Sequence, residues 1–422
     1  MKILWLAASP CGSVRRYSKQ TIAGGWLISL EDELKKMSDV DLSVAYVTNV
    51  DEADFVYDGV KYYPICNNTS NNKIGRVVDR VKSFASIDEK LIKKTLRIID
   101  EVKPDLIHIH GTENSFGLVQ EYVRDIPILF SIQGLIAPYK EKYFSGIEYK
   151  DARKYEPLKD KLIKMSVKDD YRSFCYRAAR ERKYLQCAKF IAGRTFWDEN
   201  ISLALNPNRM YFVVNEIMRH PFYVKKWNKE HFSPTLRIVS TISGGIYKGF
   251  ENVLKTASLL KQYSDLDFEW IVAGYNAETK WVKIACKATG ISYETVNVKL
   301  LGRIDADKLS DVLVSSDIYV HVSHIENSPN SVCEAMLVGM PIIASFTGGT
   351  ASILDNHHEG EFVQDGDPYV LAGWIIKLYD NFEQAKKMGD NARKRAMLRH
   401  NPTSVIQELL NAYNLILRKY EL

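Results

Sequence analysis

The chain has 422 residues, enough for two domains of ordinary size, and its 46% hydrophobic and 26% charged residues are typical of a globular protein. A formal net charge of +5 is too small over this length to indicate nucleic-acid binding, and no recognised nucleic-acid module is present, so we expect no such partner. The six cysteines form no CxxC pair, which predicts reduced thiols and gives no zinc motif.

The opening MKILWLAASPCG has a short apolar run, one lysine and then Pro10. This pattern predicts a buried first strand over residues 3–8 in place of a secretion signal. No window reaches the ~20 apolar residues that a membrane-spanning helix needs. We therefore expect a cytoplasmic protein, which can still touch the inner face of the plasma membrane.

Short apolar runs alternate with helical patterns along the whole chain. The runs that predict buried strands are 3–8, 42–47, 106–110, 128–132, 190–193 and 211–214, then 237–240, 270–273, 298–301, 318–322 and 342–345. Such alternation is typical of α/β proteins whose parallel sheets are covered by helices on both faces.

The polar stretch KKWNKEHFSP (225–234) divides the two series and predicts a linker. The expected plan is a first Rossmann-like domain over 1–224, the linker over 225–234, a second such domain over 235–400, and a C-terminal helix over 401–422. That helix has one apolar face, which can pack on either domain. Open parallel sheets bind ligands at the carboxyl ends of their strands, so the cleft between the domains is the expected site.

Residues 138–183 combine basic, aromatic and helix-forming residues, with 14 Lys/Arg against 8 Asp/Glu, a balance of 14 − 8 = +6. This composition suits an anionic membrane surface or a lipid diphosphate headgroup. The alternative is a solvated basic helical hairpin.

The stretch HIENSPNSVCEAMLVGMPIIAS (324–345) follows the strand predicted at 318–322. Ser328 and Pro329 predict a helix start with the serine as N-cap, and Gly339 ends the helix. The first backbone N–H groups, those of Asn330, Ser331 and Val332, would have no intrahelical partner. They predict an anion site.

Two carboxylates flank this helix start. Glu326 lies before it, and Glu334 lies roughly 9 Å along the axis at ~1.5 Å per residue. Ionised carboxylates accept hydrogen bonds from vicinal hydroxyls but donate none to phosphate. The spacing therefore suits a diphosphate at the helix start with a sugar near Glu326 and a ribose near Glu334. In the alternative both are solvated, although the apolar neighbours of Glu334 argue against exposure.

The pair Glu326-x7-Glu334, followed by GMPIIAS and GG, resembles the donor site of retaining family 4 glycosyltransferases, which have the GT-B fold. Gly24-Gly25-Trp26 resembles the family's glycine-rich loop, and PDLIHIHGTE (104–113) its strand with a cleft histidine. YKGFENVLKTASLL (247–260) resembles its phosphate-binding helix start. GRTFWDE (193–199) and NEIMRHPFY (215–223) resemble a subset that acts in bacterial surface-polysaccharide assembly.

The resemblance implies a GT-B-like fold of two Rossmann-like domains and a role for each matching residue. Glu326 and His110 would face the transferred sugar, and Gly24 and Gly25 would lie near the diphosphate. Lys248, with the amides of Asn330 and Ser331, would meet the negative charge that develops on the leaving diphosphate. Glu334 would hold the ribose.

In that family the first domain binds the acceptor. Tyr139 and Lys140 from the basic segment, and Asn215 and Glu216 after the strand at 211–214, are the candidates here. The function implied is transfer of a hexose-type sugar, with retention, from a nucleotide diphosphate sugar to a saccharide acceptor. The expected acceptor is carried on a polyprenyl diphosphate, in cell-surface polysaccharide biosynthesis.

One departure from the family pattern concerns the diphosphate. An arginine about five residues before the lysine is usual, whereas here Ser243 or a neighbour holds that place. Backbone amides of Gly244 and Gly245, or the Arg303 side chain, are possible replacements. The departure leaves open a catalytically inactive nucleotide-sugar-binding protein, or another GT-B enzyme such as an epimerase or phosphorylase.

Other polar residues receive structural interpretations. Asp-x-Asp pairs, which hold a metal in many other glycosyltransferases, include Asp305 and Asp367, and both are placed to cap helices. We therefore expect neither a metal nor another cofactor. His108 is interpreted as a core residue, and His321 and His324 as structural residues. Arg219 is either a cleft residue or a surface anchor.

Overall fold

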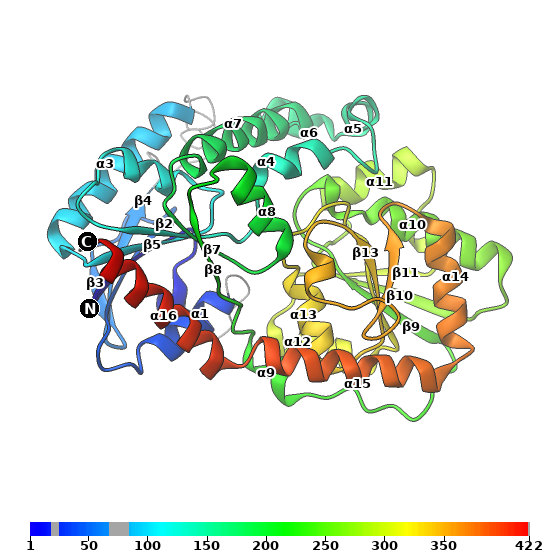
Figure 1. Cartoon of the computed structure of the whole chain (residues 1–422). Helices are drawn as coiled ribbons and strands as arrows, with labels where there is room; N and C mark the ends of the chain where they lie inside the picture. The colour runs from blue at the N-terminus through cyan, green and yellow to red at the C-terminus, as the bar shows by residue number, and fades with distance from the viewer. Residues whose placement is uncertain (18–24, 67–83, 421–422) are drawn as a thin grey trace.

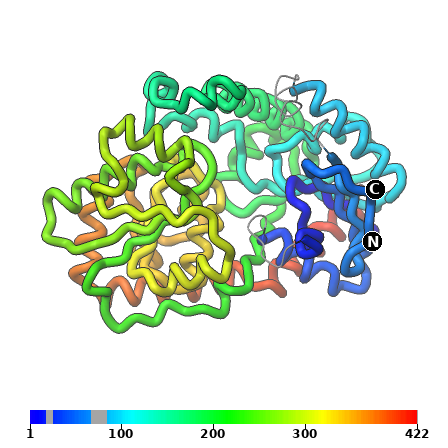
Figure 2. Tube along the Cα trace, turned by 180° about the vertical axis from the view of Figure 1, so that it is seen from behind, coloured from blue at the N-terminus to red at the C-terminus, as the bar shows by residue number. Residues whose placement is uncertain are grey.

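The computed structural model describes residues 1–17, 25–66 and 84–420 (Figure 1). Gly24, one of the predicted donor-site residues, lies outside the described residues. Two β-sheets form the centres of two domains that lie side by side, and the two chain ends lie close together on the first domain in both views (Figures 1 and 2).

The first sheet has the order β3-β4-β2-β1-β5-β6-β7-β8 among the described residues. All neighbours are parallel except β3 and β4. Its strands are β1 (Lys2–Ala7), β2 (Asp41–Thr48), β3 (Phe55–Tyr57), β4 (Val60–Cys66), β5 (Leu106–His110), β6 (Ile128–Ser131), β7 (Phe190–Gly193) and β8 (Met210–Val213). The sequence pattern did not predict β3 and β4, where exposed residues and Pro64 interrupt the apolar run.

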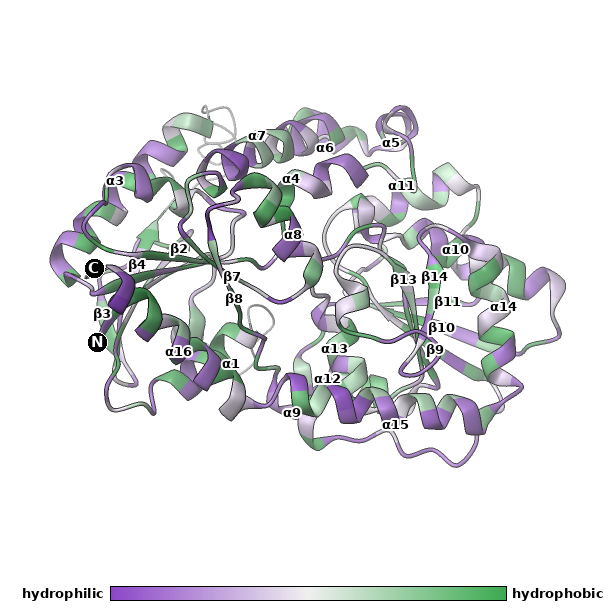
Figure 3. Ribbon diagram, in the orientation of Figure 1, coloured by the Kyte–Doolittle hydropathy of each residue, from purple (hydrophilic) through white to green (hydrophobic). Residues whose placement is uncertain are grey.

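The second sheet is wholly parallel, in the order β11-β10-β9-β12-β13-β14. Its strands are β9 (Leu236–Thr241), β10 (Phe268–Ala273), β11 (Val298–Gly302), β12 (Ile318–His321), β13 (Ile342–Phe346) and β14 (Glu361–Gln364). The predicted strands are all present, and β14 is an edge strand that was not predicted. The strands of both sheets are largely apolar, and helices on each face shield them from water (Figure 3).

Helices of the first domain cover both faces of its sheet (Figure 1). They are α1 (Gly25–Leu34), α3 (Phe84–Val102), α4 (Ile136–Tyr139), α5 (Tyr149–Tyr155), α6 (Leu158–Leu162), α7 (Val167–Leu185) and α8 (Phe196–Leu205), and α9 (His220–Val224) leads to the second domain. The second domain has α10 (Phe250–Tyr263), α11 (Lys280–Thr289), α12 (Ala306–Ser315), α13 (Asn330–Val338), α14 (Pro368–Tyr379) and α15 (Phe382–Arg399).

The C-terminal helix α16 (Pro402–Tyr420) packs on the first domain, which settles the choice that its apolar face left open. The Tyr413 hydroxyl accepts a hydrogen bond from Trp5 Nε1 at 3.1 Å and lies 2.6 Å from His108 Nδ1. Since α15 belongs to the second domain, the chain ends by crossing back to the first (Figure 1). His108 is a core residue, as predicted.

Residues 225–234, predicted as a linker, lie against the second domain. The Trp227 amide donates to the Val338 carbonyl at 2.8 Å, and its indole Nε1 donates to the Ser316 carbonyl at 2.8 Å. The connection between the domains is therefore fixed to the second domain by a buried aromatic side chain. Among the described residues, no helix is both long and apolar enough to cross a bilayer.

Candidate active site

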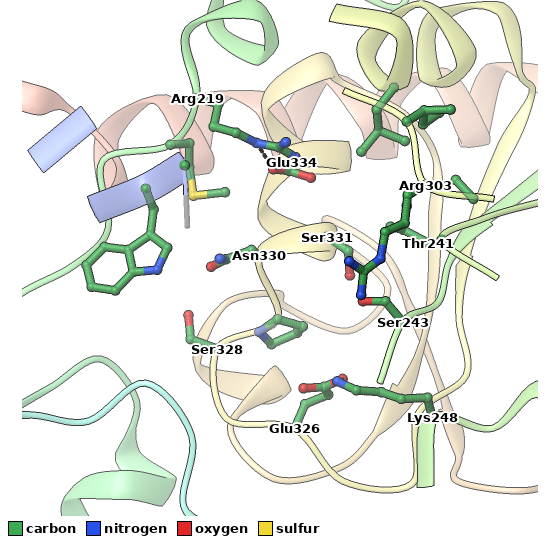
Figure 4. A pocket seen from close by; sticks show the side chains of 18 of the residues that line it. Arg219, Thr241, Ser243, Lys248, Arg303, Glu326, Ser328, Asn330, Ser331 and Glu334 are labelled. Atoms are coloured by element: carbon green, nitrogen blue, oxygen red, sulfur yellow. Dashed lines mark hydrogen bonds and ion pairs between the residues drawn. The ribbon is translucent and has the colours of Figure 1, made fainter. Parts of the chain in front are cut away.

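A cavity of about 530 Å³ lies between the domains, at the carboxyl ends of the second sheet's strands (Figure 4). Thr241 ends β9, Ala273 ends β10 and Arg303 follows β11, as expected for a site on an open parallel sheet. The cavity lining comprises, from the first domain, Gly25, Trp26, Gln133, Met218 and Arg219, and from the second Thr241, Ser243, Lys248, Ala273, Gly274, Arg303, Ile304, Leu309, Glu326, Ser328, Pro329, Asn330, Ser331 and Glu334.

Helix α13 points its first turn into this cavity. The helix begins at Asn330, with Pro329 as the N-cap residue, and ends at Gly339, whose φ of 88° is left-handed. The predicted serine cap is wrong, because the Ser328 hydroxyl donates to the Glu216 carboxylate of the first domain and no side chain caps the helix. Gly339 ends the helix as predicted.

The anion site at this helix start is smaller than the sequence predicted. The Val332 N–H donates to the Pro329 carbonyl at 2.9 Å, so it is not free. In the described part of the chain, the N–H groups of Asn330 and Ser331 have no acceptor, and the buried Asn330 Oδ1 has no donor. These unpaired groups line the cavity, which suits a ligand that accepts from the two amides.

Lys248 and Glu326 form an ion pair at one side of the cavity, with 2.5 Å between Nζ and Oε1 (Figure 4). His321 Nε2 lies 3.7 Å from the same carboxylate oxygen. Burial would raise the pKa of Glu326, but Lys248 and His321 outweigh it and hold the pKa at about 2. Burial lowers the pKa of Lys248, and Glu326 more than restores it. Both groups are therefore charged near neutral pH.

Close backbone contacts at two glycines, Gly249 and Gly348, position the Lys248–Glu326 ion pair. Gly249 follows Lys248 with a left-handed φ of 77°, and a Cβ there would lie 2.0 Å from the Val322 carbonyl oxygen beyond β12. Gly348, with φ of 52°, approaches the Glu326 carbonyl so closely that a Cβ would lie 1.7 Å from it. Only glycine fits either position. These contacts explain why Lys-Gly and the Gly pair after β13 accompany the glutamate.

Arg219 and Glu334 form a second ion pair at the other side of the cavity, across the domain boundary (Figure 4). Arg219 Nε lies 2.9 Å from Glu334 Oε1, and Nη2 contacts the same oxygen. Burial raises the pKa of Glu334, and Arg219 offsets this only in part. Arg219 therefore lines the cleft and is not a surface anchor. A Cβ on Gly25 would lie 2.4 Å from Arg219 Cδ, so this glycine makes room for the arginine.

Arg303 supplies a cation where the sequence lacks the expected arginine. Its guanidinium is directed toward Ser243 and Ser331 (Figure 4). No hydrogen bond or ion pair engages the Arg303 side chain within the described ranges. Thr241 and Ser243 add hydroxyls to the same wall. Sequence reasoning named Arg303 only as a possible replacement and missed Thr241, whose position at the end of β9 was the available signal.

His110 ends β5 as predicted but lies outside the cavity lining, with 1% of its surface exposed. Its ring centroid lies 4.4 Å from that of Trp5, 3.8 Å from that of His108 and 6.0 Å from that of Trp26. Neither ring nitrogen has a hydrogen-bond partner among the described residues. Burial, with His108 and Arg194, lowers the pKa of His110 well below its usual value. Its contact with a sugar stays a prediction.

Glu216 is buried beneath the cavity and joins the domains. It accepts from Arg194 Nη1 at 3.0 Å and from the Ser328 hydroxyl. Burial would raise the pKa of Glu216, but Arg194 and His400 hold it at about 2. Asn215 is half-buried beside it, and its Oδ1 has no hydrogen-bond partner within the described ranges.

Tyr139 is buried at the domain boundary, with ring centroids 5.9 Å from Trp197 and 5.7 Å from Tyr247. Lys140 is half-exposed, 3.6 Å from the Glu141 carboxylate. The structure thus brings the predicted donor-site residues Gly25, Lys248, Glu326, Asn330, Ser331 and Glu334 together around one cavity. It places the other predicted site residues outside the cavity lining: His110, Tyr139, Lys140, Asn215 and Glu216.

His324 lies between two carboxylates at a second contact of the domains. Its Nε2 is 2.6 Å from Glu251 Oε1 and its Nδ1 is 3.3 Å from Asp365 Oδ2. Lys142 of the first domain lies 3.7 Å from the same Asp365 oxygen. Burial lowers the pKa of His324, but hydrogen bonds to Asp365 and Glu251 raise it to about 9.

Asp305 and Asp367, each from an Asp-x-Asp pair, cap helices as predicted. Asp305 accepts from the Lys308 amide at 2.8 Å, and Asp367 accepts from the amides of Tyr369 and Val370. Across the residues that the structure covers, no group of three or more His, Cys, Asp or Glu side chains is arranged to hold a metal ion.

Comparison with known proteins defines the class. Residues 225–395 match the family "Glycosyl transferases group 1", and this range carries all of the cavity residues of the second domain. The chain is a glycosyltransferase, and its two Rossmann-like domains have the GT-B fold predicted from the sequence.

Relatives and solved structures agree with this class. A probable sucrose-phosphate synthase of Thermosipho melanesiensis is 23% identical over 92% of this chain and 90% of its own length. An uncharacterized glycosyltransferase of Methanocaldococcus jannaschii is 29% identical over 39% of this chain and 41% of its own. An amylovoran biosynthesis glycosyltransferase of Erwinia amylovora is 28% identical over 34% of this chain and 36% of its own.

Among solved structures, the sucrose-phosphate synthase of Thermosynechococcus elongatus superposes with a TM-score of 0.73 at 13% identity, over 99% of this chain and 100% of that one. HepE of Anabaena, in complex with UDP and glucose, has a TM-score of 0.65 at 15% identity, over 98% of this chain and 99% of that one.

Proposed function

We propose that this glycosyltransferase transfers a hexose-type sugar, with retention of the anomeric configuration, from a nucleotide diphosphate sugar to a saccharide acceptor. The observation that supports this most is the arrangement around α13. Two unpaired amides at its start lie between Glu326 and Glu334 in one interdomain cavity.

In the proposed donor pose the diphosphate lies at the amides of Asn330 and Ser331. Lys248 and Arg303 flank this position, so fixed donors and cations meet the charge that develops as the anomeric C–O bond breaks. Little reorganisation is needed at the helix start and at Lys248, because the fold and the ion pair with Glu326 already hold these groups. The sugar then lies near Glu326 and the ribose near Glu334.

We further propose that transfer needs no divalent metal. Lys248 and Arg303 can supply the positive charge that a metal gives the leaving diphosphate elsewhere. Turnover that survives EDTA would support this proposal. Turnover that EDTA abolishes and manganese restores would contradict it.

A uridine diphosphate sugar is the first donor to test, because the HepE structure contains UDP and glucose. Thermal-shift assays with UDP-, GDP-, ADP- and dTDP-sugars would test the donor class, since a ligand that binds the folded state raises the melting temperature. Glu326→Ala should leave the shift from free nucleotide diphosphate intact and blur the preference between sugars. Absence of a shift with every sugar nucleotide would contradict the proposal.

For the acceptor, we propose a saccharide carried on a polyprenyl diphosphate at the cytoplasmic face of the membrane, in cell-surface polysaccharide biosynthesis. The relative named for amylovoran biosynthesis and the basic segment 138–183 support this. A membrane-fraction assay with labelled donor would show label in a lipid-extractable product. The anomeric configuration of that product tests retention.

A phosphorylated sugar is the second candidate acceptor. The relative named as a probable sucrose-phosphate synthase matches over nearly the whole chain, not only over the donor domain. Transfer to a sugar phosphate in the absence of membranes, with no label in lipid, would favour this acceptor over the lipid-linked one.

A further inference from the structure

The segment 158–165, here called the α6 tip, projects apolar side chains into solvent. Leu158 is 75% exposed and Leu162 82% exposed, and Ile163 and Met165 are more than one third exposed. Leu162 has the largest exposed fraction among the large apolar side chains of the described residues. The tip lies at the periphery of the molecule, between α5 and α7, in both views (Figures 1 and 2).

The basic and acidic side chains of the α6 tip differ in exposure. Lys159, Lys161 and Lys164 are exposed, whereas Asp160, its only acidic residue, is buried. The neighbouring Glu156 is buried too. One of its oxygens accepts from the Val167 amide at 2.6 Å, and the other lies 3.7 Å from Lys161 Nζ. The outward surface therefore carries leucines and lysines with no acidic side chain of its own.

Contacts with both domains fix the α6 tip in place. Lys280 of the second domain donates from Nζ to the Met165 carbonyl at 3.0 Å and forms an ion pair with Asp170. Ser166 and Asp169 form a capping box that begins α7 directly after the tip. These contacts fix the backbone of the tip and so keep the leucines directed toward solvent. In a loosely attached segment the leucines would be free to pack against the protein.

We propose that the α6 tip docks on the anionic surface of a lipid bilayer. Leu158 and Leu162 would enter the boundary between headgroups and acyl chains, and the exposed lysines would meet lipid phosphates. Apolar side chains ringed by lysines are complementary to such a surface, because burial and charge attraction act together there. A protein partner of this chemistry would need its own acidic and apolar face.

The position of the tip connects it to the acceptor side of the cleft. Helix α7, which follows the tip, packs against α4, whose last residue is Tyr139, a predicted acceptor residue. A lipid-linked acceptor would therefore reach the cleft from the surface that the tip contacts. This consequence rests on the proposed lipid-linked acceptor, whereas the membrane contact itself does not.

Vesicle flotation of the full chain, without any donor, tests the proposal. The protein should float with vesicles of phosphatidylcholine and phosphatidylglycerol, and far less with phosphatidylcholine alone. Replacing Leu158 and Leu162 by serine should weaken binding about tenfold for each leucine. Replacing Lys159, Lys161 and Lys164 by serine should weaken it about fivefold for each lysine, and should reduce its salt dependence.

The matched control replaces Leu398, Lys387 and Lys394 of α15 by serine, because Leu398 is 78% exposed on the other domain. This variant should float like the unmodified protein, and all variants should keep the melting temperature and the donor-induced shift. Failure to float at low salt, or flotation that the α6 variants leave unchanged, would overturn the proposal. So would self-association through the tip in sedimentation experiments. If the unmodified protein floated as expected but no sugar nucleotide shifted its melting temperature, the result would count against the proposed donor and not against the membrane contact.

Discussion

The two walls of the cleft differ in how far their polar residues reach the cavity. On the second domain, Lys248, Glu326 and Glu334 lie at the cavity surface, although each is enclosed on its other sides. On the first domain, His110 and Glu216 are buried behind that surface. Of the residues that the structure describes there, Gly25, Trp26, Gln133, Met218 and Arg219 line it.

This difference separates the residues proposed to bind the donor from residues that support the cavity wall from behind. Glu216 contacts both Arg194 and Ser328, which lies shortly before α13. Its negative charge is therefore neutralised by groups of the protein itself. Arg219, in contrast, crosses the boundary to reach Glu334. The second domain thus provides most of the wall to which we propose that the donor binds. The first domain contributes Arg219, a few neighbouring lining residues and the support behind the wall.

The largest expected effect is on turnover in Lys248→Ala. Removing a cation beside the leaving diphosphate should lower kcat by about a hundred- to a thousandfold. Nucleotide binding should fall much less, because Arg303 and the helix start remain. Steady-state kinetics with the best donor would measure this, and Lys255→Ala, an exposed lysine on α10, is the control. Unchanged kcat in Lys248→Ala would place the diphosphate elsewhere.

Next in size is the effect of Glu334→Ala on donor affinity. Each hydrogen bond from a ribose hydroxyl to a carboxylate contributes ~1.5–3 kcal/mol, so losing two should weaken donor binding about a hundredfold or more. Isothermal titration with the free nucleotide diphosphate would measure this. The exposed Glu383→Ala serves as control. A different outcome would contradict this: if Arg219→Met weakened donor binding about a hundredfold and Glu334→Ala left it unchanged, the ribose contact would be the arginine and not the glutamate.

A pH-dependent effect is expected at the second domain contact. The pKa of His324 is about 9 in the folded protein and near 6.5 when unfolded, so protonation stabilises the fold. The contribution is complete below about pH 6.5 and is lost as pH rises through 9. Its upper size is about 3 kcal/mol, from (9 − 6.5) at ~1.36 kcal/mol per pH unit.

Urea unfolding of the wild type and His324→Gln across this pH range would measure that contribution. The difference in unfolding free energy between the wild type and His324→Gln should become smaller as pH rises. The exposed His231→Gln, as control, should show no such narrowing. A gap independent of pH would show that His324 is not charged between Glu251 and Asp365.

The smallest effect is expected for His110→Phe. Both ring nitrogens are buried and have no partner in the part of the chain that the structure describes. A phenyl ring should therefore keep the free energy of unfolding or raise it by ~1–2 kcal/mol. Turnover should then change little if His110 stays enclosed. A fall of about tenfold or more in kcat, with unchanged stability, would show instead that the ring reaches the transferred sugar.

Of the described strands, the sequence by itself determined all except β3, β4 and β14, because buried parallel strands must be apolar. Gly339, Asp305 and Asp367 act as predicted because capping depends on a few adjacent residues. The glutamate pair around α13 was likewise visible, since both acids belong to one local segment.

Tertiary structure alone decided which polar residues face the cavity. Ser328 bonds to Glu216, Arg219 bonds to Glu334, and α16 covers the first domain, and each contact joins segments far apart in the chain. No local pattern encodes such partners, because they depend on how the two domains meet. The enclosure of His110 beside Trp26 and Trp5 has the same origin, since the end of a strand does not reveal what packs over it.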